Sequence, residues 1–216
     1  MVELTPPHQA LQIKKLSDFD QVRVIGALDV DLHTDAINPR VQLMGDARDL
    51  AKIAIVPRFN TIVIAASKGF PRFGPVKLAI YTSHLNVFHY EGRGRITGER
   101  LHSKALDLYI KNPGSTNLSG KLGLRYLRVK GGLIHIQGAR AHTLDIQMKD
   151  QARIELSGMS SLSYLFLEGQ GWLGLRWIRS DYLNVRVRED AVLQLGGAVK
   201  MLDVELWQRT RFNGRF

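Results

Sequence analysis

The side chains best suited to acid–base chemistry recur about every 20 residues, each one between two apolar residues. They are Asn86, Asp107, Asp145, Asn184 and Asp203. A pair of carboxylates can cleave a glycosidic bond when one donates a proton and the other acts as base or nucleophile. Arg125 and Ser163 interrupt this row at the equivalent positions. We therefore interpret the row as solvent-facing positions, and we predict no catalytic residue and no enzymatic activity.

Metal and cofactor chemistry is not indicated either. The seven histidines show neither a His-x-x-x-His pattern nor facial-triad spacing. The sequence has no cysteine, which excludes disulfides, thiolate zinc sites, iron–sulfur clusters and cysteine catalysis. Gly92-Arg93-Gly94 and Gly169-Gln170-Gly171 belong to turns, and no Walker lysine is present. We predict neither a metal site nor a cofactor.

Arginine and tryptophan provide the candidates for binding. Residues 91–216 carry 20 Lys and Arg against 12 Asp and Glu, whereas residues 1–90 carry 10 against 8. Arg and Trp are enriched at the energetic centres of protein interfaces. We predict that a partner binds basic, tryptophan-bearing corners formed by Arg93, Arg95, Arg128, Lys130, Trp172, Arg176, Trp177, Arg179, Arg188 and Trp207. Two alternatives are an anionic surface and a charged face that serves only solubility. Nucleic acid is disfavoured because no recognised binding module is present.

The elements that would position these residues form a repeat from residue 85 onward. Each repeat opens with Leu, a variable residue and then an aliphatic residue or Tyr, starting at Leu85, Leu106, Leu124, Leu144, Leu162, Leu183 and Leu202. A period of about 20 residues with two short strands predicts a β-solenoid. One coil cannot bury its apolar side alone, so coils stack about 4.8 Å apart and pair their backbones. A β-sandwich with hairpins is the alternative.

The rest of the chain also favours strands. Val22, Val24, Leu28, Val30 and Leu32 lie in alternating patterns, and helical periodicity is almost absent. We predict an all-β protein with one domain over residues 19–216. It would comprise a β-rich N-terminal part, residues 19–80, and a repeat region, residues 85–216. Residues 1–18 are expected to form a tail or tether, since Thr5-Pro6-Pro7 suits an extended segment.

The order of these segments is similar to that of a known family. The similarity rests on the residues Phe19, Val41-Gln42-Leu43-Met44-Gly45-Asp46, Leu50, Ile53, Ile62-Val63-Ile64, Val76-Lys77-Leu78-Ala79-Ile80 and Leu85-Asn86-Val87, followed by the glycine-rich repeats. Over residues 19–216 the chain resembles the bacterial head GIN domain, a domain of unknown function described as an autotransporter-adhesin head. The resemblance implies a right-handed β-solenoid of the pectin-lyase type, a secreted or lipid-anchored envelope protein, an adhesive role and no catalytic residues. The family's Gly-Ser-Gly corners are replaced here by charged and aromatic corners, which favours a specific protein partner.

We therefore predict a non-enzymatic interaction protein of the bacterial cell envelope, in the periplasm or at the outer membrane. It would be an adhesin-like head or a subunit of an envelope assembly such as a secretion system. No apolar run is long enough for a transmembrane helix, and no signal peptide is visible in the chain. A lipoprotein whose signal peptide and lipidated cysteine precede this chain would fit, and a cytoplasmic location stays open.

The alternatives concern the ligand. One is a pectin-lyase-like solenoid that binds or acts on carbohydrate, and another is polyanion binding, which salt would weaken steeply. The last coil is expected to expose a strand edge, which a protein partner or a second copy of the chain would cover.

Overall fold

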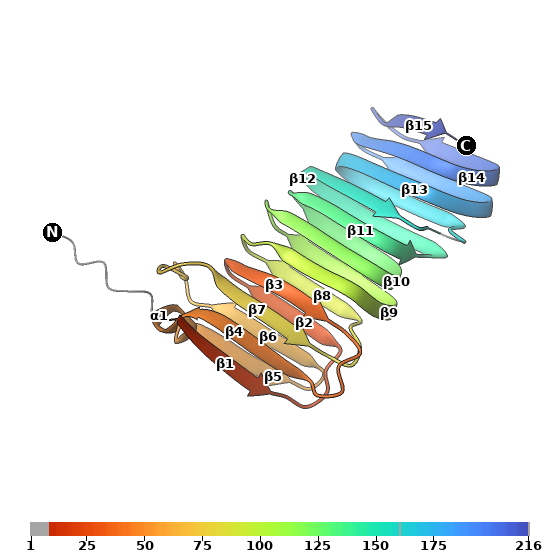
Figure 1. The fold of residues 1–216 in the computed structure, drawn as a ribbon. Helices are drawn as coiled ribbons and strands as arrows, with labels where there is room; N and C mark the ends of the chain where they lie inside the picture. Colours follow the sequence, from red (N-terminus) through yellow and green to blue (C-terminus); the bar gives the residue numbers. More distant parts are fainter. Residues whose placement is uncertain (1–8, 160, 216) are drawn as a thin grey trace.

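The protein is a β-solenoid in which stacked strands form a column, with residues 9–159 and 161–215 described in this computed structural model (Figure 1). The predicted all-β solenoid is confirmed, and the column makes about six turns. The one described helix, α1 (Ala47–Leu50), spans four residues, and no described helix has the length and apolar character needed to cross a membrane. The strands are β1 (Gln9–Lys15), β2 (Gln21–Ile25), β3 (Leu28–His33), β4 (Arg40–Asp46), β5 (Ile53–Arg58), β6 (Thr61–Ala66), β7 (Val76–Tyr81), β8 (Val87–Glu91), β9 (Ile96–Lys111), β10 (Ser115–Lys130), β11 (Leu133–Arg140), β12 (Thr143–Ser157), β13 (Tyr164–Arg188), β14 (Ala191–Leu206) and β15 (Arg211–Arg215).

The coils of the repeat region have three sides, because the long strands bend at corners. In β13 the bend between two sides lies at Trp177, whose φ is 61°. Parallel pairing between successive coils makes each side a sheet face. Face 1 comprises β8 and residues 106–111, 124–130, 143–149, 164–169, 182–188 and 201–206. Face 2 comprises residues 96–99, 115–119, 133–137, 152–157, 171–176 and 191–195 with β15. Face 3, the shortest, comprises residues 101–104, 120–123, 139–140, 178–180 and 197–199. The two strands expected per coil correspond to faces 1 and 2.

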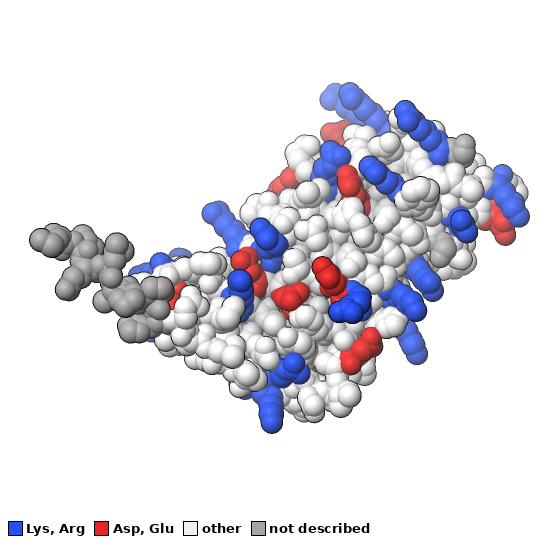
Figure 2. All heavy atoms as spheres, in the orientation of Figure 1, with Lys and Arg blue, Asp and Glu red and all other residues white. Residues whose placement is uncertain are grey.

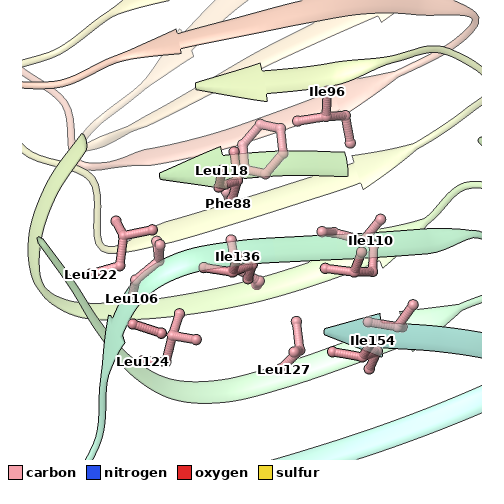
Figure 3. Close-up of a cluster of buried hydrophobic side chains, with 14 of the residues drawn as sticks. Phe88, Ile96, Leu106, Ile110, Leu118, Leu122, Leu124, Leu127, Ile136 and Ile154 are labelled. Atoms are coloured by element: carbon pink, nitrogen blue, oxygen red, sulfur yellow. The ribbon is translucent and has the colours of Figure 1, made fainter. Parts of the chain in front are cut away.

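The core consists of ladders of aliphatic side chains that point into the column (Figure 3). Parallel pairing places Ile134 beside Ile154, and Ile154 beside Leu173 on the next coil. All three side chains are fully buried. Stacking therefore buries the apolar surface that a single coil would expose. This burial stabilises the fold by about 25 cal/mol for each Å² of apolar surface. The alternation seen in the sequence is thus the inward and outward alternation of the faces.

The N-terminal end of the column departs from the repeat. β1 pairs antiparallel with β4 over residues 9–15, and β4 pairs antiparallel with β7. Residues 9–15 therefore form part of the sheet rather than the tether predicted for residues 1–18, of which residues 1–8 lie outside the described chain. Backbone pairing satisfies the hydrogen-bonding groups of this segment, which a solvated tether would leave to water.

A buried carboxylate organises the loop that joins β6 to β7. The side chain of Asp49 in α1 is fully buried and accepts hydrogen bonds from the backbone N–H groups of Arg72 and Phe73, each at 2.8 Å. These two charge-assisted bonds fix a segment that has no strand of its own.

The C-terminal end has the expected open edge. Within the described residues, β15 pairs with β14 alone. Nearby, Met201 is 62% exposed and Leu206 is 44% exposed. An edge of this kind offers unpaired backbone groups to another strand.

Candidate binding surfaces

The ten residues predicted to bind a partner are spread around the column instead of forming one patch. Figure 2 likewise shows Lys and Arg side chains along the whole visible length of the molecule, with Asp and Glu between them. Face 1 carries Arg128, Lys130 and Arg188, and Trp207 follows the last strand of this face. Face 2 carries Trp172 and Arg176, and face 3 carries Arg179. The turn between faces 1 and 2 holds Arg93 and Arg95, and the corner between faces 2 and 3 holds Trp177.

The structure does bring some members of the set together. Arg93 and Lys130 line one hollow of about 470 Å³ at the corner between faces 1 and 2, with Lys111 between them. Lys111 forms an ion pair with Glu91, and Lys130 lies 3.6 Å from Asp150. Part of the positive charge at this corner is therefore compensated within the protein.

Face 1 carries a row of outward aromatic side chains that sequence reasoning missed. Parallel pairing places His89 beside Tyr109 on the next coil, with ring centroids 5.8 Å apart. The ring of Tyr126 lies 5.3 Å from that of Tyr109. The signal was present in the sequence as aromatic residues separated by about one period, which stacking turns into neighbours.

Arginines lie over the aromatic rings of this face. Arg188 lies over both Phe166, at 5.4 Å, and Trp207, at 5.3 Å. A guanidinium group above a ring is held by cation–π attraction and keeps its donors in a fixed plane. We name as the aromatic–arginine surface the residues Tyr109, Tyr126, Arg128, Tyr164, Phe166, Arg186, Arg188 and Trp207.

A hollow of about 400 Å³ lies at one end of this surface, where Tyr109 and Arg128 line it. Arg128 there donates two hydrogen bonds to Gln147, at 3.1 and 2.8 Å, while its guanidinium lies 5.6 Å from the Tyr126 ring. Burial and, after it, the nearby Arg23 lower the pKa of His89, so this ring favours its neutral form. Lys111, Lys130 and Lys149 follow one another on adjacent coils along the same edge. Aromatic and positively charged groups are thus presented together.

The acidic row considered for glycoside chemistry lies on face 1 as well. Asp107 and Asp145 flank Tyr126 on either neighbouring coil. Both carboxylate oxygens of Asp107 accept hydrogen bonds from Arg125, at 3.1 and 2.7 Å. Asp107 is therefore engaged in an ion pair with Arg125 within the protein. In the part of the chain that the structure describes, no group of three His, Asp or Glu residues could hold a metal ion.

On face 2, Trp172 is engaged within the protein. Arg153 of the neighbouring coil lies 4.2 Å from its ring. Trp177, by contrast, is 76% exposed. Trp172 thus lies on face 2 and Trp177 at the corner to face 3, although only four residues separate them.

Comparison with known proteins accounts for this architecture. The sequence model of the family described as "Putative auto-transporter adhesin, head GIN domain" matches residues 18–194. The chain belongs to the head GIN domain family. A comparison with curated proteins gives no match.

Several solved structures share the fold of this head GIN domain at low sequence identity. A "putative adhesin" from Bacteroides fragilis is 16% identical with a TM-score of 0.77, and the match covers 96% of this chain and 97% of that one. A "putative adhesin" from Parabacteroides merdae is 10% identical with a TM-score of 0.66, covering 98% of each chain. A "Putative lipid binding protein" from Parabacteroides distasonis is 13% identical with a TM-score of 0.68, covering 98% of each chain.

Proposed function

We propose that this head GIN domain is a non-enzymatic, adhesin-like binding protein of the bacterial cell envelope that docks on a protein partner through its aromatic–arginine surface. The family description and the names of the structural neighbours support the adhesive role. The envelope location, in the periplasm or at the outer membrane with or without a lipid anchor, belongs to the same proposal. One binding face of this kind would suit either role, an adhesin-like head or a subunit of an envelope assembly.

The observation that carries the proposal is the position of Arg188 over two rings, Phe166 and Trp207. Tyr, Trp and Arg are the residues that dominate binding energy in protein interfaces. An arginine already held above aromatic rings loses less conformational freedom when it binds a carboxylate. Among the described residues no carboxylate forms an ion pair with Arg128, Arg188 or Lys149, so the partner surface should be acidic.

A site-specific photo-cross-linking experiment in the native bacterium tests this docking face. The photoreactive residue p-benzoyl-phenylalanine replaces Tyr126 on face 1 or, as a control, the exposed Gln194 on face 2. We expect a distinct cross-linked protein from position 126 that is absent from position 194. The double change Arg128→Ala and Arg188→Ala should abolish that product. Identical products at both positions, or a product indifferent to the arginine changes, would overturn the proposal.

The mass of the cross-linked product also identifies the kind of partner. A product of twice the mass of the chain would mean that a second copy covers this face. The open edge formed by β14 and β15 is a further place where a partner or a second copy would bind. Placing the photoreactive residue at Met201 tests that edge separately.

The carbohydrate-active alternative makes a different prediction. It requires that the protein turns over an acidic polysaccharide and that Asp107→Ala or Asp145→Ala abolishes this turnover. Such a loss would show that the protein is an enzyme and would replace the binding function proposed here.

A further inference from the structure

Two hollows beside face 3 share a wall that three neighbouring residues form. The hollows measure about 880 and 540 Å³, and Lys104, Gly123 and Arg140 line both of them. Gly123 pairs with Arg140 of the next coil, and a Cβ on Gly123 would overlap the backbone oxygen of Lys104 on the preceding coil. The three residues therefore follow one another on successive coils, with Gly123 between the two cations.

A third cation, Lys121, completes this group. It lies two residues before Gly123 on the same strand, pairs with His102 of the preceding coil and lines the larger hollow. Adjacent strands lie about 4.8 Å apart, and residues two apart on one strand lie about 6.6 Å apart on the same side of the sheet. Three long cationic side chains therefore surround Gly123, which has no side chain to fill the space between them. We name Lys104, Lys121 and Arg140 the three-cation cluster.

The three-cation cluster is available to a ligand. Within residues 9–159 and 161–215, no hydrogen bond, ion pair or aromatic ring engages the charged ends of Lys104, Lys121 and Arg140, and all three residues are exposed. Like charges held on neighbouring positions repel one another, and an anion between them would replace this repulsion by attraction. The cluster is therefore a place where a ligand of high negative charge would gain free energy.

The other Lys, Arg, Asp and Glu side chains of the two hollows are already paired. Asp35 is the one carboxylate among the described residues that line them, and it lies 2.8 Å from Nδ1 of His102. Arg125 forms an ion pair with Asp107 at 2.7 Å. The positive charge that these hollows present to a ligand therefore comes from the three-cation cluster.

We propose that the three-cation cluster binds the phosphate group of a sugar phosphate, with the phosphate over Gly123 and the sugar in the larger hollow. A phosphate monoester carries about two negative charges at pH 7 and three acceptor oxygens, so it can pair with all three cations. A carboxylate offers one charge and two oxygens. The larger hollow is also lined by Ser83, His84 and Asn86, whose polar groups are suited to sugar hydroxyls.

A nucleotide or a nucleic-acid strand fits these hollows less well. Proteins that bind unpaired bases commonly stack them on aromatic side chains. No Phe, Trp or Tyr is among the described residues that line either hollow. The part of the ligand that follows the phosphate should therefore be polar and not aromatic.

This inference goes beyond the proposed function and does not rest on it, because neither hollow includes a residue of the aromatic–arginine surface. The test is isothermal titration of the full chain at fixed ionic strength. The probes are glucose 6-phosphate, glucuronate, glucose, single-stranded oligothymidine and vesicles that contain phosphatidic acid, which present a phosphate monoester on a membrane. We expect glucose 6-phosphate to bind about tenfold more tightly than glucuronate, and glucose not to bind.

Variants then locate the site. Lys121→Ala and Arg140→Ala should each weaken the binding of glucose 6-phosphate about tenfold, because each change removes one charge-assisted contact. Lys77→Ala is the matched control and should leave binding unchanged. Lys77 is an exposed lysine of β7 that lines neither hollow and has no ion pair among the described residues. The thermal midpoints of the three variants, whose changed side chains are exposed, verify that each is folded.

Four results would overturn the proposal. The first is binding of glucuronate as tight as that of glucose 6-phosphate. The second is an equal loss in Lys121→Ala and Lys77→Ala, which would mean attraction by the overall charge. The third is no binding of glucose 6-phosphate, and binding of the vesicles alone would then mean a membrane site. The fourth is oligothymidine that binds more tightly than glucose 6-phosphate and loses affinity in Lys121→Ala, which would mean a nucleic-acid site.

The outcome is independent of the protein-docking proposal. The photo-cross-links at position 126 should be the same in Lys121→Ala as in the parent protein. Failure of the sugar-phosphate site is therefore distinguishable from failure of the docking face.

Discussion

The indole ring of Trp172 lies over Gly174, two residues along the same strand of β13, in the space that a side chain would fill. A Cβ on Gly174 would overlap Cη2 of the ring. Gly174 has an ordinary β conformation and is not a turn residue. Gly174 therefore leaves the space that the indole ring occupies, and a side chain at this position would have to displace the ring.

Replacement of Gly174 by Ala should displace the indole ring. The ring would leave the strand surface, and loss of its cation–π contact with Arg153 should lower the free energy of unfolding by about 0.5–1 kcal/mol. Fluorescence of Trp172 measures this in a chain that also carries Trp177→Phe and Trp207→Phe. We expect a red-shifted emission that an aqueous quencher reaches more readily. An unchanged emission spectrum together with an unchanged urea midpoint would show that the ring does not depend on Gly174.

Asn112 links two successive turns of the column. Its side chain is fully buried, its Nδ2 donates to the Gly94 carbonyl at 2.7 Å, and its Oδ1 accepts from the Gly114 N–H at 2.9 Å. Asn112→Ala should lower the free energy of unfolding by about 2–3 kcal/mol, because two backbone groups lose their partner. Urea denaturation provides the measurement. The exposed Asn117→Ala is the control and should change stability by less than about 0.5 kcal/mol. Equal effects of the two changes would contradict the role given to Asn112.

The column itself follows from the repeated triplets. Leu106 pairs with Leu124, and Leu183 pairs with Leu202, so one period of the sequence corresponds to one coil. Leu144, by contrast, pairs with Leu165 and not with the triplet residue Leu162. Apolar alternation also determines which side chains face inward. The antiparallel pairing of β1 has no such signal, since Gln9–Lys15 lacks a clear alternation and its residues pair with residues of β4 that lie 25 to 37 positions later.

The binding surfaces could be predicted by residue type but not by position. A positive φ at Trp177 turns the chain to the next face, which separates Trp177 from Trp172 in space. Conversely, Phe166, Arg188 and Trp207 come together although one or two periods separate them in the sequence. Corner geometry decides these placements, and it depends on single backbone angles that composition does not specify.

Thr116 is a polar residue within an otherwise aliphatic ladder. It is fully buried between Ile96 and Ile134, and its Oγ1 has no hydrogen-bond partner in the described part of the chain. Thr116→Val keeps the shape and removes the unsatisfied hydroxyl, so it should raise the free energy of unfolding by about 1–2 kcal/mol. Urea midpoints of the two proteins measure the gain. Thr116→Ser, which keeps the hydroxyl and loses a methyl group, should lower stability. A loss in the valine variant would show that the hydroxyl is satisfied.

Asp145 should make stability depend on pH. One of its oxygens, Oδ1, is buried without a hydrogen-bond partner among the described residues. Burial, and after it the charge of Glu168, raises the pKa of Asp145 above its usual 3.8, partly opposed by Arg128. The folded protein therefore holds this proton more tightly than the unfolded chain does. As the pH rises from about 3.8 through the raised pKa, the contribution of Asp145 to stability is lost.

Asp145→Asn removes this ionisation, and it should consequently stabilise the protein at pH 7. The gain should shrink as the pH falls toward 3.8, because Asp145 of the folded parent protein is then protonated and no buried charge remains for the amide to remove. Urea unfolding of both proteins at pH 7 and at pH 4 compares the two gains. Asp190→Asn, in an exposed turn, changes the same charge and should show no such difference between the two pH values. If Asp145→Asn raises the free energy of unfolding equally at both pH values, the effect comes from hydrogen bonds of the new amide. If it lowers the free energy of unfolding at pH 7, the ionised carboxylate is stabilised by Arg128.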